Sequence, residues 1–134
     1  MAIKRGSLTS YSWPVKFEVP GNNGESVVVE FTAMFRHLSQ SKREEIGKSL
    51  LQGEGAHRLT DAEIIDEVMC GWGDDVKGTD DNPLPFTSEN RDQIFEEFAG
   101  ARTATVLAWL DSVTNGAVKN LKTPPVTGPV AGNQ

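Results

Sequence analysis

The chain has 134 residues, a formal charge of −6 and one cysteine, Cys70, and its length predicts a single domain. The acidic charge disfavours binding to nucleic acid and to anionic membranes, and one cysteine excludes an internal disulfide and a thiolate metal cluster. No apolar segment approaches the ~18 residues that cross a bilayer, and no apolar stretch follows Lys4 and Arg5, so we expect a soluble intracellular protein without a signal peptide.

After a flexible N-terminus over residues 1–12, two alternating segments predict a β-hairpin. Apolar and polar residues alternate around a dense turn signal at residues 20–24, and this period of two is typical of strands. One face of the hairpin would carry Trp13, Val15, Phe17, Val19, Val27, Val29 and Phe31. Because an isolated hairpin is marginal in water, helices or another chain must cover this face.

Three helices are predicted downstream of the hairpin. Capping boxes, in which a hydroxyl accepts from the backbone three residues on, mark the first two at Ser41 and Thr60. The first carries Ile46 and Leu50 on one face and ends at the glycines of residues 53–55. An apolar stripe from residue 64 to residue 72 indicates the second. The third begins at Thr87, buries Ile94, Phe95 and Phe98, and ends at Gly100.

A fourth helix has the strongest apolar periodicity. Val106, Leu110, Val113 and Ala117 recur at helical spacing, and Leu107 and Trp109 widen the stripe. The opposite, polar face would carry Asp111, Ser112, Asn115 and Lys119. A flexible Pro/Gly-rich tail over residues 122–134 cannot continue this helix. The sequence therefore predicts an α+β fold: an N-terminal β-hairpin followed by about four α-helices in a single small domain over residues 13–121.

Tests for reactive chemistry fail along the chain. His37, His57 and Cys70 lack metal-ligand spacing, and the acidic loop after residue 73 fails the calcium-loop pattern. Gly47-Lys48-Ser49 copies the end of a phosphate-binding loop but lies within a predicted helix. No serine has the context of a nucleophile elbow. We therefore expect no catalytic residue, no cofactor and no metal, and do not expect an enzyme.

The aromatic and aliphatic side chains favour a role in protein–protein contact. Trp13, Trp72 and Trp109 lie on three elements, and each taken singly is best explained as core. Tryptophan is nevertheless enriched in interface anchors, and a chain this small would leave part of its apolar surface exposed. The candidate protein-binding residues are Trp109, Val106, Leu110, Val113, Trp72 and Val28.

Short motifs in the second half of the chain carry a resemblance to a known family. Residues 61–68 (DAEIIDEV) lead into Gly71-Trp72, residues 82–90 (NPLPFTSEN) open the third helix, and Lys119-Asn120 follows. In order and spacing the chain resembles the tail assembly chaperones of long-tailed bacteriophages, over about residues 13–120. Residues 78–82 (GTDDN) depart from the Asp-x-x-Gly turn that such proteins often carry before the proline.

The resemblance implies a non-catalytic chaperone of the host cytoplasm. Such proteins bind the tape measure protein, keep it soluble, help the tail-tube protein assemble around it, and are absent from the mature virion. The residues agree, because this role needs apolar surface for an amphipathic client and net charge for solubility. An unpaired hairpin edge would also permit homo-oligomers, in a ring or a helix.

Three other classes of protein remain as alternatives. A structural virion component, such as a tail-tube or head–tail joining subunit, would persist in purified particles. A small DNA-binding regulator would need a basic recognition helix, and the lysines and arginines are too sparse against the net charge of −6. An enzyme ranks last, because no polar residues converge in the pattern.

Overall fold

The computed structural model describes residues 3–52 and 59–122, with residues 51–52 and 115–122 described by their backbone alone. It confirms the α+β class, with the expected hairpin and four helices. In chain order the elements are β1 (Ser10–Pro20), β2 (Ser26–Arg36), α1 (Gln40–Gln52), α2 (Asp61–Val68), β3 (Met69–Trp72), α3 (Ser88–Glu97) and α4 (Ala101–Lys122). The glycines expected to end the first helix lie outside the described residues, as do residues 123–134 of the expected tail. Lys122, the first residue expected in that tail, still belongs to α4.

The sheet is antiparallel, in the order β1-β2-β3. β1 and β2 pair along their whole length, from Ser10 opposite Arg36 to Pro20 opposite Ser26. In this register Val15 faces Phe31, which confirms the predicted apolar face of the hairpin. β1 begins three residues before the start expected for the domain. Tyr11 is part of the packing, because its ring meets Phe35 with centroids 5.9 Å apart.

The third strand was not predicted. The apolar stripe from residue 64 was expected to remain helical to residue 72, but α2 ends at Val68 and the chain becomes extended at Met69. Gly71 has no side chain on the outer face of the sheet, where a Cβ atom would lie 3.4 Å from the sulfur of Met34. Arg36 of β2 donates to the carbonyl oxygens of residues 66, 67 and 69, so it satisfies the end of α2.

Two of the three predicted helix starts are confirmed. Thr60 and Glu63 form the reciprocal capping box of α2, and the Thr87 hydroxyl accepts from the backbone of residue 90 at the start of α3. The capping box at Ser41 is wrong, because α1 begins one residue earlier and the hydroxyl of Ser39 accepts from the Lys42 N–H at 3.2 Å. Gly100, with φ +89°, lies between α3 and α4 as expected.

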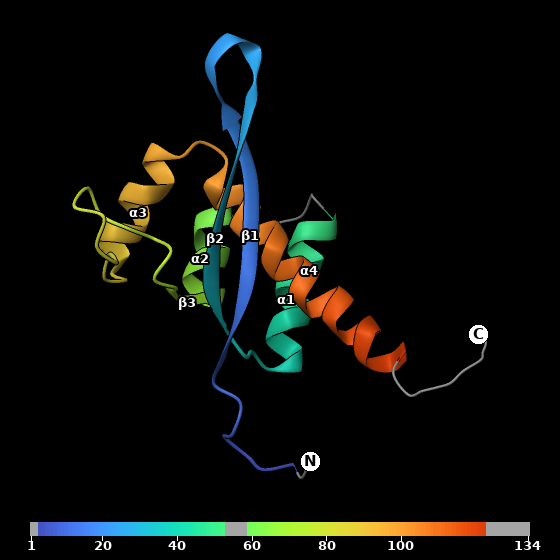
Figure 1. Cartoon of the computed structure of the whole chain (residues 1–134). Helices are drawn as coiled ribbons and strands as arrows, with labels where there is room; N and C mark the ends of the chain where they lie inside the picture. Colours follow the sequence, from blue (N-terminus) through green and yellow to red (C-terminus); the bar gives the residue numbers. More distant parts are fainter. Residues whose placement is uncertain (1–2, 53–58, 123–134) are drawn as a thin grey trace.

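Helices cover one face of the sheet, where the core lies. α4 packs across β1 and against α2, behind the hairpin, while α3 lies to one side (Figure 1). The buried apolar residues are Val15, Phe31, Ala33, Phe35, Ile46, Ile64, Ile65, Val68, Met69, Trp72, Val76, Phe95, Ala101, Val106 and Trp109.

One residue on the predicted polar face of α4 is buried. The Ser112 hydroxyl donates to the carbonyl oxygen of Trp109 at 2.6 Å, and its oxygen lies 2.7 Å from the Tyr11 hydroxyl, which therefore donates to it. Burial of Tyr11 raises the pKa of its phenol, and the hydrogen bond with Ser112 only partly opposes this effect. These two hydrogen bonds satisfy the Ser112 hydroxyl, which allows the side chain to be buried. Helical periodicity therefore placed Ser112 wrongly on the exposed face of α4.

Candidate functional site

The far half of the hairpin projects beyond the helices (Figure 1). Nearer the core Val15 and Phe31 are buried, whereas Val27 is 50% exposed and Val28 is 64% exposed. The two valines point to opposite faces of the hairpin because successive strand residues alternate. We call residues 18–28 the distal hairpin, which thus carries apolar side chains on both faces.

A tight loop closes the distal hairpin. The Gly21 N–H donates to the Glu25 carbonyl oxygen at 2.6 Å, and Asn23 and Gly24 take positive φ angles of 59° and 77°. A Cβ atom on Gly21 would lie 2.8 Å from a methyl carbon of Val27 and 3.2 Å from the Glu25 oxygen. The loop therefore requires glycine at position 21, and it fixes Val27 beside the turn.

The two long edges of the hairpin differ in their protection. The Gly73 N–H bonds to the carbonyl oxygen of Thr32, so even-numbered residues of β2 direct their backbone groups toward the β3 side. Val28 and Glu30 share this edge but lie beyond the end of β3, and no described strand pairs with them. On the opposite edge, β1 carries Pro14, which removes a donor, and charged side chains, which are common protections against sheet addition. The exposed backbone of β2 lacks a proline, so it is the more accessible edge.

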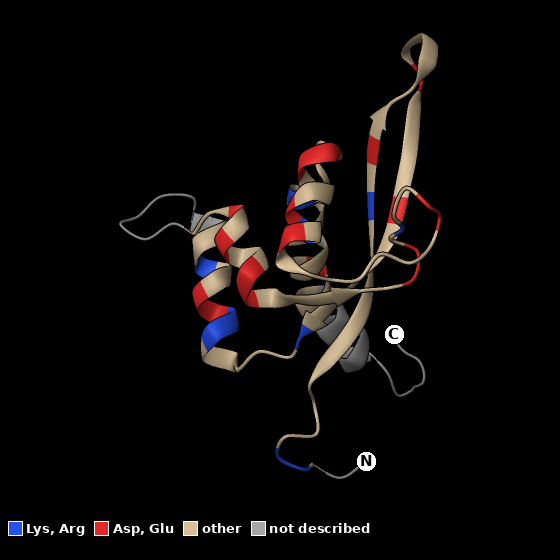
Figure 2. Cartoon of the chain, turned by 90° about the vertical axis from the view of Figure 1, so that its left-hand side faces the viewer, with Lys and Arg blue, Asp and Glu red and all other residues tan. Residues whose placement is uncertain are grey.

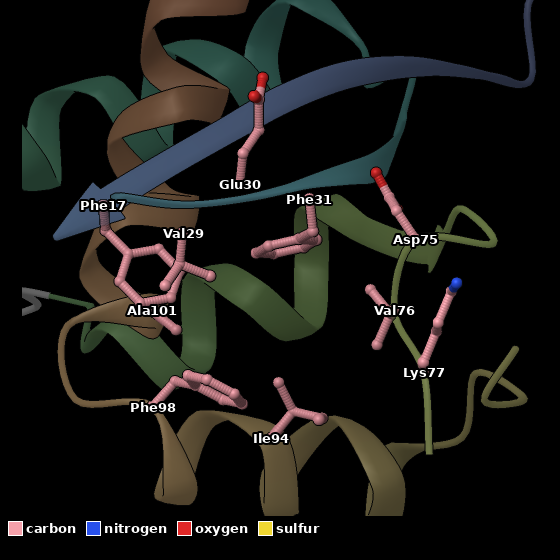
Figure 3. A pocket seen from close by; sticks show the side chains of 10 residues that line it. All are labelled: Phe17, Val29, Glu30, Phe31, Asp75, Val76, Lys77, Ile94, Phe98 and Ala101. Carbon is pink, nitrogen blue, oxygen red and sulfur yellow. The ribbon is translucent and has the colours of Figure 1, made fainter. Parts of the chain in front are cut away.

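An apolar groove lies between the inner face of the hairpin and α3 (Figure 3). Its volume is about 110 Å³. The apolar side chains that line it are Phe17, Val29, Phe31, Val76, Ile94, Phe98 and Ala101. The ring of Phe17 meets that of Phe98 edge-on, with centroids 6.3 Å apart, which closes one end of the groove. A second, wider hollow shares Ile94 and Phe98 with it and continues along α3.

The surroundings of the groove are acidic. Figure 2 shows acidic residues, in red, along α3 and in the loop after β3. Asp75, Asp80 and Glu97 line the two hollows together with one ammonium, that of Lys77. The backbone N–H of residue 82 bonds to Asp80 and lowers the pKa of its carboxyl, so Asp80 is ionised at neutral pH. A basic segment would find favourable charge here.

The candidate residues from the sequence divide between core and surface. Trp109 is 1% exposed, and Val106 and Trp72 are also buried, so in this structure the three candidates are part of the core and not of the surface. They form the core because the stripe of α4 packs on the sheet. Leu110 and Val113 are half-buried against the core, and Val28 is exposed on the distal hairpin.

Other surface residues were missed. Val27 was placed on the covered face but is 50% exposed. Ile94 and Phe98 pack against the core as expected, but they also line the groove. Leu107 was read as part of the apolar stripe and is 57% exposed on α4. The signal that could have identified the distal hairpin is its length, since strands of eleven residues exceed what short helices cover.

Polar side chains within the described ranges form no group of three or more that could hold a metal ion. His37 is exposed and its ring contacts that of Tyr11, with centroids 4.6 Å apart. Cys70 is half-buried, and His57 lies outside the described residues. Gly47-Lys48-Ser49 lies within α1, which confirms the predicted helix at these residues.

The motifs that carry the family resemblance form a structural unit around Trp72. The Trp72 Nε1–H donates to the carbonyl oxygen of Leu84 at 2.7 Å, and the Phe86 ring meets the indole edge-on at 4.9 Å. Thr87 then caps α3, and the Asn90 amide donates to the carbonyl oxygen of Pro85. These residues tie the loop after β3 to the start of α3, so they stabilise this part of the fold.

No described helix has the length and apolar character needed to span a membrane. Comparison with family models, with curated proteins and with solved structures finds no match to this chain.

Proposed function

We propose that the protein is a phage tail assembly chaperone, which binds the tape measure protein, keeps it soluble and promotes tail-tube assembly without catalysis. The observation that carries the proposal is the distal hairpin, where Val27 and Val28 are exposed on opposite faces. Exposed apolar side chains beside a free strand edge are the features expected of a surface that holds another polypeptide. In this proposal the protein acts in the host cytoplasm and leaves before the virion is complete.

The chemistry of the surface suits a transient partner. Two valines and a short strand edge offer a small contact, which favours rapid release over permanent assembly. The net charge of −6 keeps the chain soluble while it carries an aggregation-prone client, and attracts basic client segments. The resemblance of residues 61–90 to tail assembly chaperones supplies the identity of the client.

Co-expression with the tape measure protein of the same genome tests the proposal. The variant carries Val27→Thr and Val28→Thr, because threonine keeps the β-branched shape and removes apolar surface. The matched control is Leu107→Gln, which removes a side chain of similar exposure from α4. We expect the wild-type chain and the control to keep the tape measure protein in the soluble fraction. With the double variant, most of the tape measure protein should become insoluble, although the melting temperature of the variant itself should equal that of the wild-type chain.

Two results would contradict this reasoning. If the wild-type chain does not raise the soluble fraction of the tape measure protein, the chaperone proposal is wrong. If the double variant performs as well as the wild-type chain, the distal hairpin is not the binding surface.

One observation favours a structural subunit as a second candidate. The free edge of β2 at Val28 and Glu30 could pair permanently with a strand of a neighbouring subunit, as in a tail-tube or head–tail joining protein. Immunoblots of purified virions separate the two functions. A chaperone is absent from finished particles, whereas a stoichiometric band would establish the structural role.

A further inference from the structure

We propose that the leading segment of one copy, residues 3–9, docks into the groove between β2 and α3 of a second copy, with Ile3 as the apolar anchor. The inference concerns a different surface from the distal valines and does not rest on the chaperone function.

The leading segment presents apolar side chains that its own copy does not cover. Ile3 is fully exposed and Leu8 is 66% exposed. Between them a turn is closed by Ser7, whose N–H and hydroxyl both donate to the Lys4 carbonyl oxygen, with Gly6 at φ +77°. The turn therefore presents Ile3 together with the charges of Lys4 and Arg5.

The groove matches this segment in size and charge. A cavity of about 110 Å³ is of the order that holds one small apolar group, since a cavity of ~150 Å³ accepts benzene. Ile94 and Phe98 form one wall, and along the adjoining hollow the carboxylates of Asp80 and Glu97 outnumber the ammonium of Lys77. Glu30 and Asp75 also line the groove, but both carboxylates point away from it, and that of Asp75 accepts from the Thr32 hydroxyl (Figure 3). Ile3 would fill the groove while Lys4 and Arg5 face the acidic surroundings.

The backbone offers a second point of contact. Val28 and Glu30 direct their N–H and C=O groups toward the β3 side of the sheet, where no described strand pairs with them, and Glu30 also lines the groove. An extended residue next to Ile3 could pair with this edge, while the anchor enters between β2 and α3. Such strand addition combines main-chain hydrogen bonds with a side-chain pocket.

Geometry places the occupant on another copy. The His37 N–H bonds to the Thr9 carbonyl oxygen, which continues the hairpin ladder and directs the leading segment away at the open end. Phe17, in the groove, lies eight residues further along the chain from Thr9, a distance of ~27 Å in the opposite direction. Figure 1 shows the segment and the hairpin turn at opposite ends of the molecule. A contact of this kind is head-to-tail, so it builds either a ring or an open helical filament.

Sedimentation velocity of the full chain over a range of concentrations tests the inference. The wild-type chain should associate reversibly, and Ile3→Gln should weaken association by about tenfold or more, the loss expected for one buried aliphatic side chain. Leu107→Gln, which removes an exposed leucine of α4 outside both the leading segment and the groove, is the matched control and should associate as the wild-type chain does. Raising the salt from about 50 mM to about 500 mM should also weaken association, because the basic and acidic groups are screened.

A mixing experiment identifies the two surfaces. Ile3→Gln keeps an intact groove, and Ile94→Gln keeps an intact segment, so their mixture should stop at a heterodimer with a single contact. Because Ile94 is half-buried, Glu97→Lys provides a groove variant at an exposed position and should weaken association alone. A chain that is monomeric at every concentration, or one whose association survives both Ile3→Gln and Glu97→Lys, would overturn the proposal.

Discussion

Replacing Trp109 by phenylalanine should leave the protein almost as stable as the wild type, although Trp109 is the largest fully buried side chain. Its indole N–H has no hydrogen-bond partner among the described residues. A buried donor without a partner costs the full penalty of its lost hydration. Phenylalanine keeps an aromatic ring in the core and removes this donor.

The expected magnitude follows from two opposing effects. Phenylalanine lacks two ring carbons of the indole, and at ~0.8 kcal/mol for each buried carbon group this loses ~1.6 kcal/mol. Removing the unpaired N–H returns ~1–3 kcal/mol. The free energy of unfolding should therefore change by between a loss of ~0.6 kcal/mol and a gain of ~1.4 kcal/mol. Trp109→Ala has no such compensation and should cost ~3–5 kcal/mol through the cavity that it leaves.

Urea unfolding followed by far-ultraviolet circular dichroism measures both variants, and it does not depend on tryptophan fluorescence. The slope with denaturant should stay constant for phenylalanine, because the same surface is exposed on unfolding. If Trp109→Phe loses as much stability as Trp109→Ala, the indole nitrogen makes a bond that the fold depends on. The reasoning from its unpaired donor would then be wrong.

Three further predictions concern the contact of Arg36 with the end of α2, the cap at the start of α2, and the hairpin loop. Arg36→Met should lower the free energy of unfolding by ~1–2 kcal/mol in denaturant titrations, because three carbonyl oxygens lose their charged donor. The hydrogen bond from the Thr60 N–H lowers the pKa of the Glu63 carboxyl below its ordinary 4.5. This hydrogen bond therefore stabilises the protein above pH 4.5, and the stabilisation is lost as the pH falls through the pKa of the folded state. Glu63→Gln should make the melting temperature less sensitive to acid. Gly21→Ala should cost ~1–3 kcal/mol by thermal unfolding, because the new Cβ meets the side chain of Val27 and a backbone oxygen.

The hairpin and most helix starts could be predicted because their signals are local. Alternation fixes which strand residues share a face, and Thr60 and Thr87 reach only three residues along the chain. β3 could not be predicted in this way, because its pairing depends on contacts with Met34 and Phe35, which are far away in the sequence. The stripe that precedes it continues at a spacing compatible with a helix, so tertiary pairing decides where α2 ends.

The candidate site was harder to predict because exposure depends on which element covers which. Helical spacing correctly grouped Val106 with Trp109, but it could not show that the sheet covers both. The same limitation applies to Ser112, whose burial depends on the Tyr11 hydroxyl of another element. A sequence pattern gives the direction of a side chain relative to its own helix or strand. Whether another element of the same chain covers that side chain depends on tertiary packing.

The distal hairpin is exposed because the strands of the sheet differ in length. β1 and β2 have eleven residues each and β3 has four, so the hairpin runs ~24 Å beyond a strand that pairs with only one end of β2. The helices cover the half of the hairpin nearer β3, where Val15 and Phe31 are buried, and leave Val27 and Val28 exposed to water. Extending the core to the tip would need more chain or a longer third strand, whereas a second polypeptide can supply the missing cover. The apolar surface thus follows from strand length and not from an excess of apolar residues, and it lies where backbone groups of β2 are also free to pair.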